Sequence, residues 1–136
     1  PINESQDDKS QIEEYIREYQ GEGIQHIALF AEDIYRSVDA LRANGVEFQD
    51  TPDTYYEGVV ARVTGHQESL ARMKERRILI DGSAKDGILL QIFTKNVIGP
   101  IFFEIIQRKG NEGFGEGNFR ALFESIELDQ ERRGVI

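Results

Sequence analysis

The sequence has no cysteine and no tryptophan, and it has only one methionine and three prolines. Without cysteine, the chain can form no disulfide, no thiolate metal site and no cysteine nucleophile. No apolar run reaches the ~18 residues that a membrane span requires, and no signal-peptide pattern opens the chain. We therefore expect a cytoplasmic protein with no membrane partner.

Positive charge is also scarce, with 16 Lys and Arg against 25 Asp and Glu and a formal net charge of −9. Proteins that bind nucleic acids neutralise phosphates with clustered Lys and Arg, so the composition argues against such a partner. With 136 residues, of which 39% are hydrophobic, one domain can bury a core. The chain starts at Pro1 without a methionine and stops directly after a helical pattern. We interpret it as a fragment; the alternative is a complete small protein trimmed of its initiator methionine.

Helical signals lie at both ends of the chain and in its first half. The run from Ser10 to Glu13 fits a capping box and predicts a helix to about Tyr19. A second helix is expected before Gly45, which stands where a C-terminal cap glycine belongs. Two short helices are expected at 55–63 and 67–74. The apolar positions of the last helix form one stripe, made of Phe119, Leu122, Phe123 and Ile126.

Strand signals are strongest in the second half. Ile24–Phe30 is apolar enough to predict a strand buried on both faces. Further strands are expected at 46–48, 77–81, 87–94 and 101–107, with turn signals at Gly82-Ser83 and Gly99-Pro100. The order strand, helix, then three strands, with a helix before and after, predicts an α+β fold with one sheet backed by helices.

One polar side chain interrupts an apolar row in each of three predicted strands: His26, Gln91 and Glu104. Because strands alternate faces, each shares its face with apolar neighbours. A buried carboxylate requires a cation, a metal or a proton, and His with Glu suits Fe(II), Zn or Mn. The alternatives are a hydrogen-bonded core histidine, an ion-paired or solvent-facing Glu104, and a Gln91 that only ties strands together.

Other common site patterns do not fit this sequence. The glycine-rich stretch at 109–118 does not follow the strand–GxxxxGK[ST]–helix order, so a phosphate-binding P-loop is rejected. No GxSxG nucleophile elbow is present to support a Ser–His–Asp triad. His66 stands in a polar segment, and we expect it at the surface.

Several separated strings resemble 4-hydroxyphenylpyruvate dioxygenases, in order and over essentially the whole chain. They are PINE at 1–4, KSQIEEY at 9–15, GEGIQHIAL at 21–29, TPDTYYE at 51–57, LLQIFTK at 89–95, FFEIIQRKG at 102–110 and GFGEGNFRALFESIE at 113–127. The resemblance implies a βαβββ module of the vicinal-oxygen-chelate (glyoxalase/dihydroxybiphenyl dioxygenase-like) type with a C-terminal lid helix. The implied division is a lead-in helix at 1–22, the module at 23–107, and a glycine-rich loop with the lid helix at 108–136, all one fragment of a C-terminal catalytic domain.

The resemblance also implies an Fe(II) site. His26 and Glu104 match two of the three metal ligands of the family, and the third, a histidine of a preceding module, has no counterpart in this chain. The substrate would be a 2-oxoacid, 4-hydroxyphenylpyruvate, converted with O₂ to homogentisate and CO₂ in tyrosine and phenylalanine catabolism. Residues matching the family's substrate pocket are Asn3, Gln11, Gln25, Gln91, Phe93, Phe114, Asn118 and Phe119, with Phe102 and Leu122 at the lid. Gln25 is expected to support the site from behind, and for Phe123 we expect plain core packing.

Two other interpretations stay open. Hydroxymandelate synthase would use the same substrate, metal and ligands but hydroxylate the side chain. A non-catalytic fragment or binding module would keep the fold without turnover, since two protein ligands hold Fe(II) poorly. A missing half-domain would leave apolar strand surface uncovered, so we expect self-association into a homo-oligomer.

Overall fold

Four strands form one mixed sheet in the order β1-β4-β3-β2 in the computed structural model, which describes residues 2–136. Pro1, the first residue of the PINE string, lies outside the described residues. The strands are β1 (His26–Phe30), β2 (Leu79–Ser83), β3 (Gly87–Phe93) and β4 (Phe102–Lys109). β1 runs parallel to β4, whereas the pairs β4–β3 and β3–β2 are antiparallel. The predicted α+β, βαβββ arrangement is confirmed.

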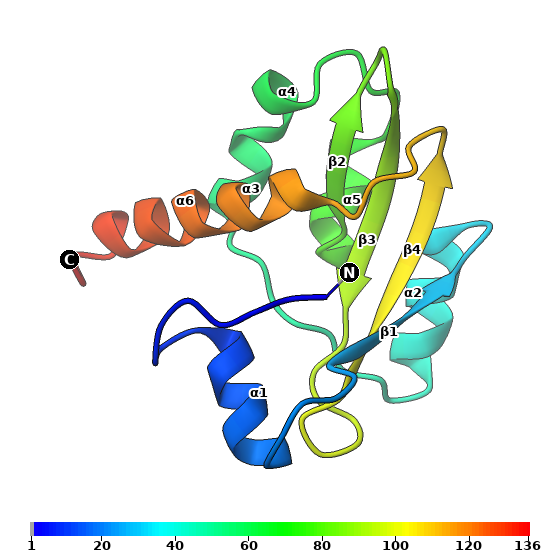
Figure 1. Cartoon of the computed structure of the whole chain (residues 1–136). Coiled ribbons are helices and arrows are strands. Elements are labelled where there is room, and N and C mark those ends of the chain that lie inside the picture. Colours follow the sequence, from blue (N-terminus) through cyan, green and yellow to red (C-terminus); the bar gives the residue numbers. More distant parts are fainter. Residues whose placement is uncertain (1) are drawn as a thin grey trace.

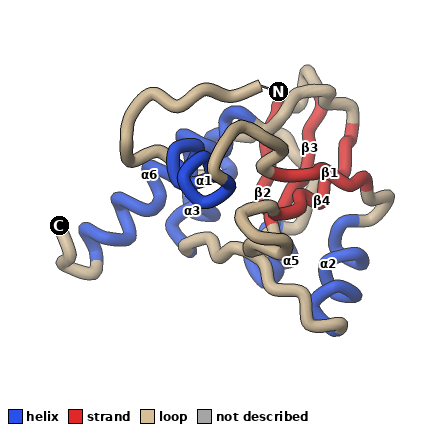
Figure 2. Tube along the Cα trace, turned by 60° about the horizontal axis from the view of Figure 1, so that its bottom comes forward, coloured by secondary structure: helices blue, strands red, loops and turns tan. Residues whose placement is uncertain are grey.

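Helices lie on both sides of this sheet (Figures 1 and 2). They are α1 (Gln11–Tyr19), α2 (Ile34–Ala43), α3 (Asp53–Glu57), α4 (Val59–Arg62), α5 (Leu70–Arg76) and α6 (Glu116–Arg132). α2 and α5 cover one face, while α1 and α6 lie on the other side. α6 starts beside β2 and then runs over α3, with which it packs.

The hydrophobic core lies between the sheet and the helices α2 and α5. We call this side of the sheet the core face; it carries Ile80, Leu90, Ile92 and Ile105, all buried. Because strand side chains alternate, the intervening residues point the other way. This opposite side, which carries His26, Leu89, Gln91 and Glu104, is the site face.

The helix starts follow the capping signals in the sequence. Ser10 accepts a hydrogen bond from the Glu13 N–H at 3.1 Å and begins α1 as predicted. Asp33 caps α2 in the same way. In the middle segment, α3 and α4 meet at Gly58, and α5 begins after the cap Ser69. The short helices expected at 55–63 and 67–74 are thus present with shifted limits.

Three strand expectations need correction. β1 is not buried on both faces: Ile27 is 42% and Phe30 70% exposed, because β1 is the outermost strand of this sheet and pairs only with β4. The strand expected at 46–48 is only an isolated bridge between Phe48 and Thr94. β2 starts two residues late, because Arg77 ends α5 in a left-handed conformation with φ 61°.

Most of the apolar stripe of α6 faces outward, although Leu122 is half-buried and packs against the core. Phe119 is 69% and Phe123 63% exposed, so the core packing expected for Phe123 is wrong. The helix docks through small and polar residues, with Asn118 and Ser125 buried. Thr54 of α3 donates to the Ser125 carbonyl at 2.6 Å. Burial of this polar edge leaves the aromatic edge of the same helix open.

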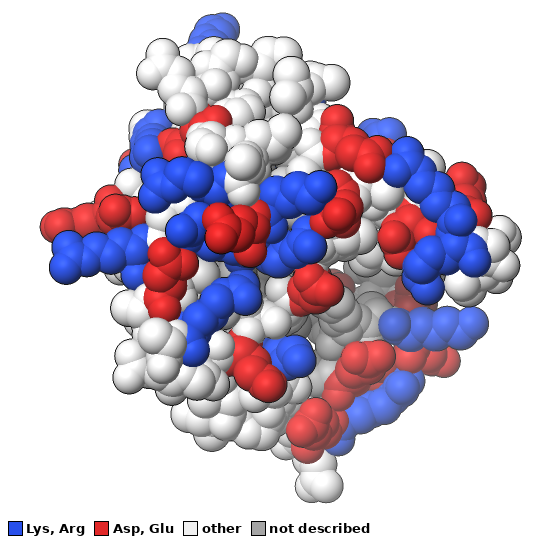
Figure 3. All heavy atoms as spheres, turned by 180° about the vertical axis from the view of Figure 1, so that it is seen from behind, with Lys and Arg blue, Asp and Glu red and all other residues white. Residues whose placement is uncertain are grey.

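Charges of both signs are interspersed on the side that α2 and α5 form (Figure 3). Ion pairs connect neighbouring elements there, such as Arg76 with Asp39 at 2.9 Å and Arg77 with Asp53 at 2.6 Å. Among residues 2–136, no helix is both long and apolar enough to cross a membrane.

Candidate metal centre

His26 and Glu104 come together on the site face. They stand on adjacent parallel strands, and the register places Ala28 opposite Glu104 and His26 opposite Phe102. His26 Nε2 lies 3.5 Å from Glu104 Oε2, and Glu104 is only 7% exposed. The two residues expected to converge from strand polarity are therefore adjacent.

The His26 ring is held in place by two phenylalanines and an amide. It stacks on Phe102, with ring centres 5.1 Å apart, and meets Phe93 edge-on at 6.1 Å. Its Nδ1 lies 3.1 Å from the amide oxygen of Gln25. An amide oxygen can only accept, so this bond places the ring proton on Nδ1 and leaves the lone pair of Nε2 facing Glu104.

Glu104 is held from its other oxygen. Gln91 Nε2 donates to Glu104 Oε1 at 2.8 Å, and Gln91 is 1% exposed. The bond occupies Oε1, so Oε2 is the oxygen that faces His26. Each of the two converging groups therefore has one atom fixed from behind and one lone pair directed at the same spot.

This donor set fits a divalent cation. Two ligand atoms about 2.1 Å from a metal and about 90–110° apart lie roughly 3.0–3.4 Å from each other. The observed Nε2–Oε2 separation of 3.5 Å is close to that range. Two lone pairs facing each other repel, and a cation between them would remove the repulsion. Within residues 2–136, no third His, Cys, Asp or Glu joins this pair to form a metal-binding group.

The other residues proposed for the site divide into two sets. Gln25, Gln91, Phe93 and Phe102 contact His26 or Glu104 directly. Gln11 does not, but it lines a cleft of about 280 Å³ together with Gln25 and Phe102. Solvent-exposed or half-buried positions away from the pair are taken by Asn3, Phe114, Phe119 and Leu122. His66 is half-buried and accepts from the Glu68 N–H.

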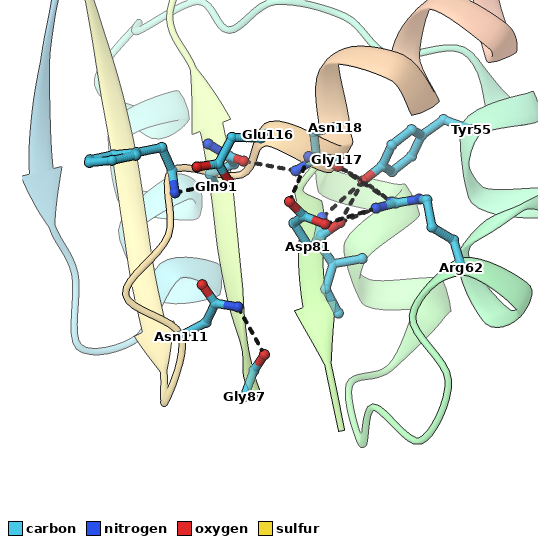
Figure 4. Close-up of polar contacts among 11 residues, drawn as sticks. Tyr55, Arg62, Asp81, Gly87, Gln91, Asn111, Glu116, Gly117 and Asn118 are labelled. Carbon is cyan, nitrogen blue, oxygen red and sulfur yellow. Dashed lines mark hydrogen bonds and ion pairs between the residues drawn. The ribbon is translucent and has the colours of Figure 1, made fainter. Parts of the chain in front are cut away.

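Asn118 is placed differently from a pocket residue. It is 2% exposed, and its Nδ2 donates to Gln91 Oε1 at 2.8 Å. Its Oδ1 accepts from Tyr55 Oη at 2.5 Å and lies 3.3 Å from Arg62 Nη2. Figure 4 shows these side chains pointing toward one another from α6, β3, α3 and α4. The amide is thus buried between the sheet and the two short helices.

Sequence reasoning missed three members of this cluster: Tyr55, Arg62 and Asp81. Arg62 Nη2 donates to Tyr55 Oη at 2.8 Å, and its Nη1 lies 3.4 Å from Asp81 Oδ1. Burial raises the pKa of the Tyr55 phenol, so the hydroxyl stays protonated as a donor. Asp81 could have been suspected, because it is an acidic residue at the end of the apolar RILID strand. Tyr55 and Arg62 could not, because their segment has a mixed, polar composition without a helical or strand periodicity.

Two glycines of the GFGEGN stretch allow α6 to approach the sheet this closely. A Cβ on Gly115 would lie 1.7 Å from Gln91 Oε1, and a Cβ on Gly117 would lie 2.5 Å from Asp81 Oδ1. Gly115 also has φ +74°, which favours glycine. The Gly117 N–H donates to Asp81 Oδ2 at 2.9 Å. The glycine-rich stretch therefore seats the start of α6 against β3 and β2.

Comparison with known proteins agrees with this architecture. Residues 2–70 match the glyoxalase/bleomycin resistance protein/dioxygenase superfamily. The chain is 72% identical, over all of its length, to a 4-hydroxyphenylpyruvate dioxygenase of Pseudomonas aeruginosa and to Hemolysin VllY of Vibrio vulnificus. In both cases it spans 38% of the relative's length.

A solved structure is similar as well. A mutant 4-hydroxymandelate synthase from Streptomyces coelicolor superimposes with a TM-score of 0.71 at 36% identity, over 88% of this chain and 34% of that one. The fold, the match over residues 2–70 and the identity to named dioxygenases agree. The chain belongs to the glyoxalase/bleomycin resistance protein/dioxygenase superfamily and, within it, is similar to 4-hydroxyphenylpyruvate dioxygenases.

Proposed function

We propose that this chain supplies His26 and Glu104 to an Fe(II) centre in a dioxygenase of the relatives' full length. That protein would convert 4-hydroxyphenylpyruvate and O₂ to homogentisate and CO₂, as a step in the breakdown of tyrosine and phenylalanine. The observation that carries the proposal is the approach of two ligand atoms. His26 Nε2 and Glu104 Oε2 lie 3.5 Å apart, and their lone pairs point toward the space between them. Residues 1–136 would form part of the C-terminal catalytic domain, divided at about 22 and 107 as expected from the sequence.

The residues of this chain would hold the centre rather than perform bond-making steps. Gln25 fixes the tautomer of His26, and Gln91 fixes Glu104, which is the usual work of the groups behind metal ligands. Phe93 and Phe102 pack around the imidazole and keep water from its sides. When bound, Fe(II) would supply the positions at which a 2-oxoacid and O₂ meet.

The remaining pocket residues would contribute from outside this cluster. Phe114 and Phe119 present exposed aromatic surface at the start of α6, available to a planar ring once the site is closed. Asn3, Gln11 and Leu122 would complete the polar and apolar walls. Asn118 acts through Gln91, because both of its polar atoms are already engaged.

A related outcome of the same site is side-chain hydroxylation, as in 4-hydroxymandelate synthase. The structural similarity to a 4-hydroxymandelate synthase, with a TM-score of 0.71, supports side-chain hydroxylation as the second candidate reaction. The higher identity, 72%, is to a protein named as the dioxygenase, and it supports homogentisate as the product. Product analysis by mass spectrometry after incubation with 4-hydroxyphenylpyruvate separates them, since hydroxymandelate in place of homogentisate would overturn the dioxygenase assignment.

The ligand assignment is tested in the full-length protein, meaning a protein of the relatives' length that carries this chain. Glu104→Ala and His26→Ala should each reduce iron content and lower turnover by at least about a thousandfold, because each removes one protein ligand from a site that has few. Glu68→Ala is the matched control, as Glu68 also has a largely buried carboxylate but lies in the ion pair with Lys109. Turnover retained in Glu104→Ala would disprove the assignment.

Three further expectations stay predictions. The isolated 136-residue chain should bind iron weakly and produce no homogentisate. It should self-associate along β1, whose outward residues are exposed. A clean monomer in light scattering would count against that expectation. A cytoplasmic location, expected from the sequence, is checked by fractionation.

A further inference from the structure

A row of hydrogen bonds runs from Arg62 to Glu104 with one direction throughout. Arg62 and the Ile80 N–H both donate to Tyr55 Oη, at 2.8 and 3.0 Å. Tyr55 has one proton to give, and Asn118 Oδ1 at 2.5 Å is a nearer acceptor than the Ile80 carbonyl at 3.1 Å. Asn118 Nδ2 then donates to Gln91 Oε1, and Gln91 Nε2 donates to Glu104 Oε1. The row starts at a group that can only donate and ends at one that can only accept, so each bond polarises the next. We call Arg62, Tyr55, Asn118, Gln91 and Glu104 the relay.

The donors near Asn118 Oδ1, which include the guanidinium of Arg62, fit one orientation of both amides. Asn118 presents its oxygen to Tyr55 and to the cation, because the opposite orientation would place an NH₂ group against donors. With Oδ1 so placed, Nδ2 must face Gln91. Gln91 then has to accept through Oε1, which leaves Nε2 to donate to Glu104. Reversal of any one amide would bring two donors or two acceptors into contact along a buried row.

Asp81 and the glycines keep the relay closed. Asp81 lies beside Arg62 at 3.4 Å and accepts the Gly117 N–H at 2.9 Å, so it holds the cation and the first turn of α6 together. Figure 4 shows Arg62 and Gly117 approaching this carboxylate from different elements. Gly115 allows Gln91 to sit directly under the same turn. The start of α6 and the orientation of Gln91 are therefore coupled.

We propose that Arg62 is a positioning residue, which acts through Tyr55, Asn118 and Gln91 to keep Glu104 Oε1 occupied and Glu104 Oε2 free as the metal-facing oxygen. The inference rests on the proposed metal site for its consequence. The relay itself rests on distances between residues of this chain. It assigns a role to a cation that is separated from the carboxylate by three intervening residues and lies on a helix that none of the pocket residues occupies.

The test compares three variants of the full-length protein. Arg62→Met removes the donor and keeps the length of the side chain, whereas Arg62→Lys keeps a donor-only cation. Arg133→Met is the matched control, since Arg133 forms only an exposed ion pair with Asp129 at the far end of α6. One readout is the dissociation constant for Co(II), and the other is hydrogen–deuterium exchange of residues 113–122 in metal-free protein.

Arg62→Met should weaken Co(II) binding about tenfold, near the lower end of the effect of changing a group behind a metal ligand. It should also speed exchange at the start of α6. Arg62→Lys should restore the affinity to within about threefold of wild type, because a donor-only group again orients Asn118. In a Gln91→Leu background, Arg62→Met should change the affinity less than about twofold, since the relay is already cut.

The outcomes separate the two proposals. If Glu104→Ala abolishes Co(II) binding while Arg62→Met behaves like Arg133→Met in affinity and exchange, the relay is overturned and the metal site stands. If Co(II) binding is insensitive to Glu104→Ala, the metal site fails, and exchange in metal-free protein still decides whether Arg62 holds α6. Equal losses in Arg62→Met and Arg62→Lys would also overturn the relay, because shape rather than donor chemistry would then matter.

Discussion

The two faces of the sheet use the same strands but are stabilised differently. On the core face, the apolar side chains of Ile80, Leu90 and Ile92 belong to one hydrophobic cluster with residues of α2 and α5. On the site face, the neighbouring positions include Gln91 and Glu104, which are also buried but are hydrogen-bonded to each other. The core face is held mainly by apolar packing, which requires no particular pairing of donors and acceptors. The site face depends on donors and acceptors that fit in one arrangement.

The site face is itself unequal. Its β2 and β3 part is closed by the start of α6, and every buried side-chain polar atom in the described chain has a hydrogen-bond partner. Its β1 part is open, with Phe30 70% exposed. A closed half that fixes Glu104 beside an open half that presents His26 suits a site whose final ligand and substrate approach from the β1 side.

The largest effect is expected from neighbouring leucines that point to opposite faces of β3. Leu90→Ala, on the core face, should destabilise the chain by about 3–5 kcal/mol, because the packed helices cannot collapse into the cavity. Leu89→Ala, equally buried on the site face, should cost about 2 kcal/mol, since Leu89 lies outside the main hydrophobic cluster. Urea unfolding followed by circular dichroism measures both. Equal losses would show that the two faces are packed to the same rigidity.

The next largest loss of stability is expected at Gly115, where the start of α6 packs against the sheet. Gly115→Ala should cost about 3 kcal/mol, from the left-handed backbone and from the contact of its Cβ with Gln91. Gly134→Ala is the matched control: its φ is +71° but nothing lies within 4 Å of an added Cβ, so the backbone term of about 1 kcal/mol acts alone. Thermal unfolding compares the two. A Gly115→Ala loss no larger than that of Gly134→Ala would mean that α6 can lift from the sheet without penalty.

The sequence alone predicted the local features of the fold and the convergence of His26 and Glu104. Alternation in three strands placed His26, Gln91 and Glu104 on one face, and capping residues placed α1 and the ends of the helices. It was insufficient where two distant segments meet. The burial of Asn118 depends on Tyr55 and Arg62, which come more than fifty residues earlier in the chain. The hydrophobic periodicity of neither segment predicts this contact. Core packing was expected for Phe123 and is wrong, because periodicity alone cannot distinguish a helix face that packs within the chain from one that stays exposed.

A smaller effect is expected at α1, which stands on the same side as the site. Ser10→Ala removes the oxygen that accepts the Glu13 N–H and should cost about 1 kcal/mol. The loss should appear as faster hydrogen exchange in α1 while β3 is unaffected, because α1 contributes little to the core. Ser83→Ala, at the end of β2, is the control, because the Ser83 hydroxyl likewise accepts a backbone N–H three residues later, that of Asp86. Matching loss of protection in β3 would show that α1 folds as one unit with the sheet.

The smallest effect is the loss of stability at acid pH that comes from an ion pair between α2 and α5, on the outer side of these helices. The hydrogen bond with Arg76 lowers the pKa of Asp39, which joins α2 to α5. A carboxyl whose pKa is lowered by folding stabilises the fold above its unfolded pKa of about 4 and loses that contribution as pH falls through the folded pKa. Stability should therefore drop between about pH 5 and pH 3.

The free energy of unfolding of Asp39→Asn should be lower than that of the wild type at pH 6, should fall less steeply with decreasing pH, and should equal the wild-type value at the acid end. Because the Asp39 carboxylate is largely exposed, 1 M salt should shrink the difference. A wild-type acid slope unchanged in Asp39→Asn would mean that this pair adds nothing, and that the core face is held by its apolar contacts alone.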